Sequence, residues 1–451
     1  MRSLGFEHVQ SEVRRHKAVR VMGRVVSARR GTLTVSGLEQ AGVGDQVQLA
    51  PEKFDSLYGE VVAIDHGRQT IMSDGDTEGI VARDPVIHLG RASISPDDSW
   101  LGRVIDCFGR PMDNEPLLGG LQARALNAPP PDPVTRRLLG QRLETGQAVL
   151  NTMLPVVRGQ RIGLFAGSGV GKTTLLARLA HHLEADVVVI AMVGERGREV
   201  REFIEKVVGP KAMPRCVVVT ATSDRSALQR RRCAWTAMAV AEYFRDRGQH
   251  ALLLFDSITR FADAHREIAL AAGEPATMRG YPPSVAQLIT SLAERAGPGG
   301  DGQSDITAVF SVLVPGSDME EPIADIIRGT LDGHVVLDRE IAERGRFPAI
   351  DVLRSVSRAL PACASEPENQ LILKARETLG AYERAELMVQ AGLYQAGTDP
   401  RIDDAIRVWP ALDAFFAMSE KEDTPASFAA LEECLAPASD STLEQSQRDG
   451  G

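Results

Sequence analysis

RIGLFAGSGVGKTT, residues 161–174, is the most informative stretch of this sequence. Its first six residues form an apolar run typical of a buried strand, and a glycine-rich turn then leads into a helix-compatible segment. Glycines allow successive backbone N–H groups to turn inward around a phosphate chain, and the following helix adds its positive N-terminal dipole. The stretch therefore predicts a phosphate-binding P-loop, with alanine in place of the first glycine of the stricter pattern. The residues expected to hold the nucleotide are Ala166, Gly167, Ser168, Gly169, Val170, Gly171, Lys172, Thr173 and Thr174.

The chemistry expected at such a loop requires ATP and Mg²⁺. Lys172 can reach the β- and γ-phosphates, and the Thr173 hydroxyl can ligate the metal. A second acidic group is expected from Asp256, which ends the apolar run ALLLFD. P-loop ATPases carry an aspartate at this place, where it holds the metal. Asp256 could also cap the helix expected after Ser257, and the two roles are compatible.

Hydrolysis also needs a group that orients and polarises water. The run GERGRE, residues 194–199, directly follows an expected strand. Ligand-binding groups in open α/β sheets lie just beyond the carboxyl ends of strands, so a carboxylate here would face the γ-phosphate. Spacing alone does not separate Glu195 from Glu199. Either acid could instead serve only to stabilise the N-terminus of the next helix.

From about residue 102 to residue 362, apolar runs alternate with helix-compatible segments. Apolar strands separated by helices imply a parallel sheet covered on both faces. The expected strands are residues 161–166, 187–193, 216–221, 251–256, 307–314 and 334–337. The expected helices include residues 173–183, 200–208 and 227–247.

The two ends of the chain have a different character. Between about residues 19 and 88, short β-branched runs alternate with turns, the last run being Gly79-Ile80-Val81, which predicts a small β-barrel. Residues 368–435 are helix-compatible and are broken near Gly397-Thr398-Asp399-Pro400. The predicted fold class is α/β, a RecA-like P-loop NTPase core with an N-terminal β-barrel and a C-terminal helical domain. The predicted boundaries are a basic N-terminal arm at 1–18, a β-barrel at 19–95, the ATPase domain at 96–362, a helical domain at 363–436 and a disordered tail at 437–451.

Composition excludes several classes of protein. The 451 residues carry a net charge of −10, which disfavours a general nucleic-acid binder. The sequence contains no run of about 18 consecutive apolar residues, so no membrane-spanning helix is predicted. The N-terminus also lacks the apolar core of a signal peptide. The five cysteines form no C-x-x-C pair, so we expect reduced thiols in a cytosolic protein. Eight of the first 30 residues are Lys or Arg, which fits either a solvated arm or a dock for an acidic partner or anionic lipid.

Three long stretches resemble the export ATPases of flagellar and virulence type III secretion, which are related to rotary ATPases. They are residues 193–205, the run DSITRFADAHREIALAAGEPATMRGYPP at 256–283, and residues 318–358. A shorter segment, GRVID at 102–106 with Gly109-Arg110-Pro111, is similar to one shared by rotary ATPases generally. The resemblance covers nearly the whole chain. Ser284-Val285-Ala286-Gln287 departs from it, because it lacks an aromatic that many relatives carry after Ser-Val.

This resemblance implies a homohexamer with nucleotide bound between subunits, at the cytoplasmic side of an inner-membrane export apparatus. The implied partners are a central stalk protein, a peripheral stalk or regulatory protein, the membrane export gate, and export chaperones with their substrate proteins; nucleic acid is not expected. Loop 316–322, with the acids Asp318, Glu320 and Glu321, matches a loop that touches the central stalk in rotary ATPases. Local sequence alone predicts that this loop is a solvated turn.

The resemblance also assigns roles to residues. It favours Glu195 as the catalytic carboxylate and places Arg196 near the γ-phosphate. Arg358 matches an arginine that a neighbouring subunit inserts into the site, where it stabilises transition-state charge. Phe347 matches an aromatic that packs on adenine, although core packing is an alternative role for it.

Other functions share parts of this pattern. A catalytic subunit of an ATP synthase or ion pump would use the same chemistry, but the 256–283 stretch resembles the export branch more closely. A non-catalytic ring subunit is disfavoured by Glu195, since non-hydrolysing relatives generally lack that carboxylate. A nucleic-acid translocase is disfavoured by the acidic balance and by the absence of a basic, aromatic-interleaved motif. Flagellar export is favoured over virulence export on overall similarity.

Overall fold

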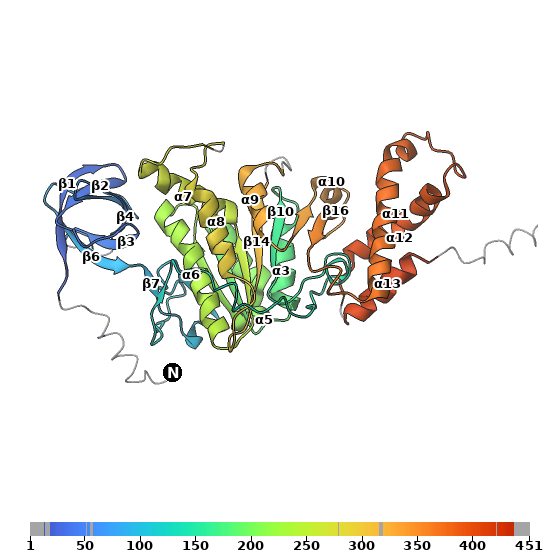
Figure 1. Ribbon diagram of the computed structural model, residues 1–451, viewed down its shortest axis with the longest axis horizontal. Helices are drawn as coiled ribbons and strands as arrows, with labels where there is room; N and C mark the ends of the chain where they lie inside the picture. Colours follow the sequence, from blue (N-terminus) through green and yellow to red (C-terminus); the bar gives the residue numbers. More distant parts are fainter. Residues whose placement is uncertain are drawn as a thin grey trace, which may run out of the picture. The chain divides into compact units, whose positions relative to one another are not determined.

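The computed structural model describes residues 13, 19–50, 52–54, 57–277, 279–314, 319–420 and 422–436 (Figure 1). The predicted arm, apart from Val13, and the predicted tail lie outside the described residues, as does Asp318 of the acidic loop. The chain forms two compact units. Unit 1 comprises Met1–Gly140, Arg158–Ser168 and Ala185–Leu331, and unit 2 comprises Gln141–Val157, Gly169–Glu184 and Asp332–Gly451. The domain boundaries named above stay predictions.

Unit 1 begins with the predicted barrel. Six antiparallel strands close in the order β1-β2-β5-β4-β3-β6 around a core that includes Leu33, Val47 and Ile71. The strand predicted at Gly79–Val81 is wrong: the Val81 N–H donates to Asp84 Oδ2 in a turn (2.8 Å), and the last strand starts only at Pro85. The strands are β1 (Met22–Arg29), β2 (Thr32–Ser36), β3 (Asp45–Leu49), β4 (Tyr58–Asp65), β5 (Arg68–Ser73) and β6 (Pro85–Arg91).

The rest of unit 1 is built on a parallel sheet with the strand order β10-β14-β13-β11-β12-β8. Every residue of three of these strands, β11, β12 and β13, is buried, which explains why their sequences are unbroken apolar runs. The strands are β8 (Arg103–Asp106), β10 (Arg161–Ala166), β11 (Val187–Val193), β12 (Cys216–Ala221), β13 (Ala251–Asp256) and β14 (Ile306–Leu313). β7 (Ser93–Ile94) and β9 (Arg124–Ala125) pair antiparallel in a separate two-stranded sheet, and the short helix η1 (Asp98–Trp100) precedes β8.

Helices cover this sheet, and Figure 1 shows α6, α7 and α8 running alongside its strands. Helix α6 packs on β11, β12 and β13 and on α7. The helix predicted at 200–208 is split, because its second half takes a π-helical form. The helices of unit 1 are α4 (Gly197–Glu202), η2 (Phe203–Val208), α5 (Gly209–Ala212), η3 (Met213–Arg215), α6 (Ala227–Asp246), α7 (Ile258–Ala271), α8 (Ser284–Arg295) and α9 (Pro322–Thr330).

Unit 2 combines the helix of the P-loop, a β-hairpin and the C-terminal helices. The predicted break near Gly397–Pro400 is confirmed, since α12 starts at Pro400 with Asp399 as its cap. Tyr382 of α11 and Trp409 of α12 stack with ring centroids 4.4 Å apart and an interplanar angle of 9°. Its elements are α2 (Ala148–Asn151), α3 (Lys172–His182), β15 (Gly333–Leu337), α10 (Arg339–Glu343), β16 (Ile350–Ser357), α11 (Glu366–Gln390), α12 (Pro400–Ala417) and α13 (Thr424–Cys434). No helix in the described part of the chain is both long enough and apolar enough to cross a membrane.

Candidate nucleotide site

The predicted site residues are divided between the two units. Unit 1 holds the start of the P-loop, Ala166, Gly167 and Ser168, together with Glu195, Arg196 and Asp256. Unit 2 holds Gly169, Val170, Gly171, Lys172, Thr173, Thr174, Phe347 and Arg358. Within unit 1, Glu195 and Asp256 lie on the same side of the sheet, where the carboxyl ends of its strands meet. Within unit 2, the structure brings Phe347 to the P-loop.

The P-loop follows its expected course from a buried strand into a helix. β10 ends at buried Ala166, and α3 begins at Lys172 with Gly171 as its N-cap. Gly169 and Gly171 have φ angles of +80° and +91°, a conformation that favours glycine. Thr173 and Thr174 are exposed in the first turn of α3. An exposed helix N-terminus behind a glycine turn has a geometry that suits an anion. Phosphate binding by this loop stays a prediction.

Phe347 lies directly against the P-loop. A β-carbon added at Gly171 would come within 3.2 Å of Phe347 Cδ1, so glycine is needed there for space as well as for its φ angle. The Phe347 side chain is 43 % exposed, unlike an aromatic packed in a core. Its neighbour Arg346 is buried and donates to the Ile350 carbonyl (2.8 Å), which anchors the segment. The partly open ring beside the phosphate loop suits stacking on a base.

Asp256 is 5 % exposed at the carboxyl end of β13. Its Oδ1 accepts a hydrogen bond from the Ser311 hydroxyl, 2.6 Å away on the neighbouring strand β14. Helix α7 is capped by Ser257, whose hydroxyl accepts from the Arg260 N–H, so this cap does not use Asp256. A carboxylate and a threonine hydroxyl are hard oxygen ligands of the type that Mg²⁺ prefers, so the side-chain chemistry of Asp256 and that of Thr173 each fit this metal.

Glu195 and Asp256 come from adjacent strands. The register pairs Met192 of β11 with Asp256 of β13, and Glu195 follows two residues after the end of β11. Backbone bonds hold this turn: the Gly194 N–H donates to the Ala221 carbonyl (2.7 Å), and the Glu195 carbonyl accepts from Ser223 (3.0 Å). Asp256 therefore lies at the carboxyl end of its strand and Glu195 just beyond the end of the neighbouring one, the region where ligands of such sheets bind.

Arg196 and Glu199 face solvent rather than the interior of unit 1. The Arg196 guanidinium lies 3.6 Å from Glu199 Oε1, and its side chain is 82 % exposed. Glu199 occupies the first turn of α4, where a negative charge favours the helix N-terminus. Glu199 therefore has a local role that is independent of nucleotide. Glu195, in contrast, precedes the helix and is not part of its first turn.

Arg358 is exposed and directly follows β16 in unit 2. Its backbone N–H donates to the Asp332 carbonyl (3.0 Å). The preceding residue is also fixed, because the Ser357 hydroxyl donates to the Pro155 carbonyl (2.6 Å). A rigid backbone that carries an exposed guanidinium is compatible with a contact to another subunit.

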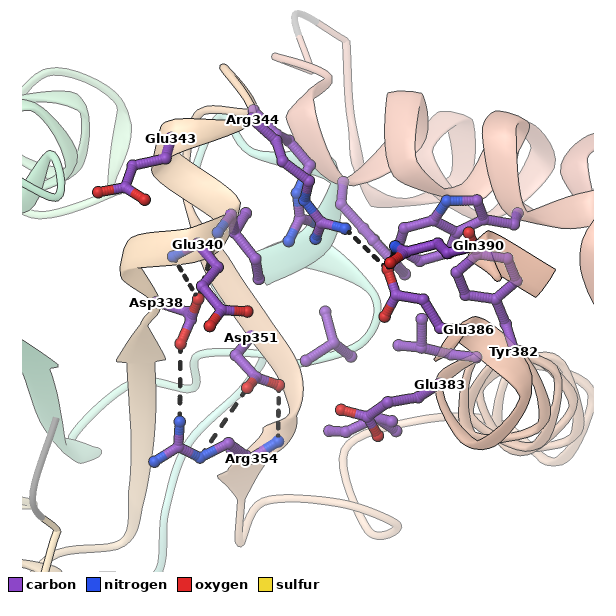
Figure 2. Close-up of a pocket in the computed structure, with 17 residues that line it drawn as sticks. Asp338, Glu340, Glu343, Arg344, Asp351, Arg354, Tyr382, Glu383, Glu386 and Gln390 are labelled. Carbon is purple, nitrogen blue, oxygen red and sulfur yellow. Dashed lines mark hydrogen bonds and ion pairs between the residues drawn. The ribbon is translucent and has the colours of Figure 1, made fainter. Parts of the chain in front are cut away.

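Figure 2 shows a cavity of about 640 Å³ in unit 2, between the β15–β16 hairpin with α10 and the helices α11 and α12. Most of its charges pair with one another: Arg354 lies 3.7 Å from Asp338, and Arg344 lies 3.4 Å from Glu386. Burial and nearby Asp351 raise the pKa of Glu383. No residue of the P-loop lines this cavity, so it is distinct from the predicted phosphate site.

The buried cysteines have no sign of reactivity. Burial raises the pKa of Cys107 to about 12 and that of Cys216 to about 11, so both remain thiols at neutral pH. In the described part of the chain all five cysteines are free, and no cluster of His, Cys, Asp and Glu is arranged to hold a metal.

Two groups near the site were missed by sequence reasoning. The sequence pattern places Ser311 within an apolar strand, yet its hydroxyl contacts Asp256. Thr259 accepts a hydrogen bond from the Leu313 N–H (2.9 Å), which ties the start of α7 to the end of β14. A hydroxyl inside an otherwise apolar strand was the available signal for Ser311, since buried hydroxyls need partners.

Comparisons with known proteins agree with this architecture. Residues 146–357 match the model of the ATP synthase alpha/beta family, nucleotide-binding domain, and residues 364–433 match that of the T3SS EscN ATPase C-terminal domain. The flagellum-specific ATP synthase of Caulobacter vibrioides is 45 % identical over 91 % of this chain and 95 % of its own length. The type 3 secretion system ATPase of Pseudomonas syringae pv. syringae is 42 % identical over 90 % of this chain and 92 % of its own.

A solved structure has the same fold along nearly the whole chain. The assembled ATPase EscN from the type III secretion system of enteropathogenic E. coli superimposes with a TM-score of 0.85 at 36 % identity, covering 92 % of this chain and all of the other. EscN in complex with its central stalk EscO gives a TM-score of 0.82 with the same coverage. The predicted fold class is thereby confirmed.

Proposed function

Because this chain belongs to the family of flagellum-specific and type III secretion ATPases, we propose that it hydrolyses Mg²⁺-bound ATP to drive the export of flagellar proteins. The observation that carries the chemistry is the glycine turn at Gly169–Gly171, which opens directly into α3 and is flanked by Phe347. Flagellar relatives from Caulobacter vibrioides (45 %) and Bacillus subtilis (48 %) favour flagellar over virulence export.

Each residue of the proposed site has a separate task. The backbone N–H groups of the P-loop and Lys172 bind the phosphates, and Phe347 packs on the adenine. Thr173 and Asp256 hold Mg²⁺, which when bound neutralises charge on the β- and γ-phosphates. Glu195 orients and polarises the attacking water. Arg196 lies near the γ-phosphate.

Hydrolysis in this proposal depends on assembly into a homohexamer. Arg358 of one subunit reaches the nucleotide of the next and stabilises the charge that develops in the transition state. Exposure of Arg358 is consistent with this role. EscN, the structural relative, has been solved assembled and with a central stalk, and we propose that this chain likewise forms a ring around a stalk protein.

The remaining partners follow from the proposed function. They are a peripheral stalk or regulatory protein, the membrane export gate, and chaperones with their export substrates. We place the ring in the cytoplasm, peripherally associated with the inner-membrane export apparatus. The basic arm at 1–18 is the proposed contact with a regulatory partner or with anionic lipid.

The proposed chemistry is tested by two substitutions with different expected effects. Lys172→Ala should weaken nucleotide binding as well as hydrolysis, because it removes a phosphate contact. Glu195→Gln should keep ATP affinity near normal and lower turnover by roughly two or more orders of magnitude, because only the activation of water is lost. Fluorescent-nucleotide binding and phosphate release measure the two quantities separately.

Glu199→Gln is the matched control for Glu195→Gln. It removes the other carboxylate of the same segment and should leave turnover within a few-fold of the parent. Near-normal turnover in Glu195→Gln together with a large loss in Glu199→Gln would transfer the water-activating role to Glu199.

A further inference from the structure

Ser311 is a fully buried polar residue within the apolar strand β14, whose sequence is ITAVFSVL. The register pairs Phe310 of this strand with Phe255 of β13, so Ser311 lies opposite Asp256. On its other side, Ser311 pairs with Leu164 of β10, the strand that leads into the P-loop. A buried hydroxyl at this position costs free energy unless it is hydrogen-bonded, and here its partner is the Asp256 carboxylate.

The contact between these two side chains is short. Ser311 Oγ lies 2.6 Å from Asp256 Oδ1, which is the distance expected for a hydroxyl that donates to an ionised carboxylate. A carboxylate has two oxygens, and a donor fixed on Oδ1 restrains rotation of the whole group. The orientation of Oδ2 is then set by β14 rather than by β13 alone.

The donor itself is held in place. Two residues beyond Ser311, the Leu313 N–H donates to Thr259 Oγ1 (2.9 Å) in the first turn of α7. Asp256 and Thr259 are joined through Ser257, the cap of α7. β14, the end of β13 and the start of α7 therefore form one hydrogen-bonded frame around the carboxylate.

We propose that Ser311 is a positioning residue that presents the Asp256 carboxylate to Mg²⁺. The inference rests on the proposed function, in which Asp256 holds the metal. Ser311 would not contact the metal or the nucleotide. Partners of this kind, which orient a metal-binding group, typically change metal affinity by 10- to 100-fold when removed.

The test compares three variants of the full-length protein. Ser311→Ala removes the donor, and Ser311→Thr keeps a hydroxyl at the same place. Thr307→Val is the matched control, because Thr307 is also fully buried on β14 and accepts from the Gly159 N–H (2.9 Å), but near the opposite end of the strand. Each is measured by the Mg²⁺ dependence of fluorescent-ADP affinity and by Mn²⁺ binding in electron paramagnetic resonance, with thermal unfolding as the check on folding.

We expect Ser311→Ala to weaken Mn²⁺ binding with ADP about tenfold or more while metal-free ADP affinity is unchanged. Ser311→Thr should restore metal binding to within a few-fold, and Thr307→Val should lower the melting temperature without changing metal binding. Equal metal affinity in folded Ser311→Ala and parent protein would overturn the proposal. If Ser311→Ala does not fold, Ser311→Cys, a similar shape with a weaker donor, takes its place with the same expected direction.

Asp256→Asn separates this inference from the proposed function. If Asp256→Asn itself leaves metal binding intact, the metal role of Asp256 is wrong. If Asp256→Asn weakens metal binding but leaves a measurable residual affinity, Ser311→Ala added to it should cause no further loss, because the carboxylate that it orients is gone. A further loss in the double variant would show that Ser311 acts by another route and would also overturn the positioning role.

Discussion

At the scale of single residues, Phe347 is the clearest contribution of the structure to the candidate site. The sequence alone left it open whether this ring packs in a core or on a base. The ring lies against Gly171 and is 43 % exposed, so one side meets the P-loop and the rest is available to a ligand. The adenine contact stays a prediction, now with a defined geometry beside it.

We expect Phe347→Ala to raise the KM for ATP about three- to tenfold with little change in kcat. An aromatic contact contributes about 0.5–1.5 kcal/mol beyond its buried area, and stacking on the base is made equally in the ground and transition states. Steady-state kinetics measure both constants. Phe347→Tyr, which keeps the ring, is the control and should resemble the parent, whereas an unchanged KM in Phe347→Ala would exclude the contact.

At the scale of elements, a polar chain joins the barrel to the helices of unit 1. Arg231 of α6 forms an ion pair with Glu60 of β4 and contacts His265 Nδ1 on α7 (3.3 Å). His265 Nε2 lies 2.9 Å from the Ser284 hydroxyl on α8, which donates to Glu274 Oε2 (2.6 Å). Since Arg231 is a donor only, His265 Nδ1 must accept, and the ring is neutral in this arrangement. Burial, with a contribution from Arg231, lowers the pKa of His265 to about 4.

This arrangement predicts a pH dependence of stability. His265 binds a proton more readily in the unfolded chain, at the ordinary value near 6.5, than in the folded one, so unfolding takes up protons between these two values. The contribution of neutral His265 is therefore intact above about pH 6.5 and falls as pH drops toward 4, by up to about 3 kcal/mol. His265→Gln should flatten this part of the curve of unfolding free energy against pH, measured by denaturant titration.

The control for His265 is His66→Gln, because His66 is a highly exposed histidine of the barrel. It should leave the pH curve of the parent unchanged. A slope between pH 4 and 6.5 that is the same in His265→Gln and in the parent would mean that other groups, and not this histidine, cause the loss of stability in acid.

At the scale of the whole molecule, the proposed function requires more than one chain. Arg358 is expected to complete the site of a neighbouring subunit, so specific ATPase activity should rise with protein concentration as rings form. Mixing inactive Arg358→Ala chains with inactive Lys172→Ala chains should restore part of the activity, because some interfaces then combine an intact P-loop with an intact arginine. Turnover assays paired with sedimentation measure activity and assembly together.

The mixing experiment has its own control. Arg358→Ala mixed with the double variant Lys172→Ala/Arg358→Ala places no intact arginine at any interface and should stay inactive. A parent protein that is fully active as a monomer would contradict the requirement for a neighbouring subunit.

The amino-acid sequence alone was enough to predict several strands, the P-loop and the family of this protein. The strands β10 to β13 were predicted with their exact ends, because strands buried on both faces of a parallel sheet must be apolar throughout. The P-loop was predicted because its glycines and helix start are adjacent in the chain and depend on local backbone geometry. The family followed from long motifs.

Only the tertiary structure decided the features that join distant parts of the chain. Strands β6 and β16 were missed because neither forms an unbroken apolar run. Only Val86 of β6 is buried, and residues 350–357 of β16 include charged and exposed positions. The contacts of Ser311 with Asp256 and of Phe347 with Gly171 join residues 55 and 176 positions apart. Such pairs depend on strand order and packing, which no local pattern encodes, because a hydroxyl or a ring has the same local signature whether or not a partner is brought to it.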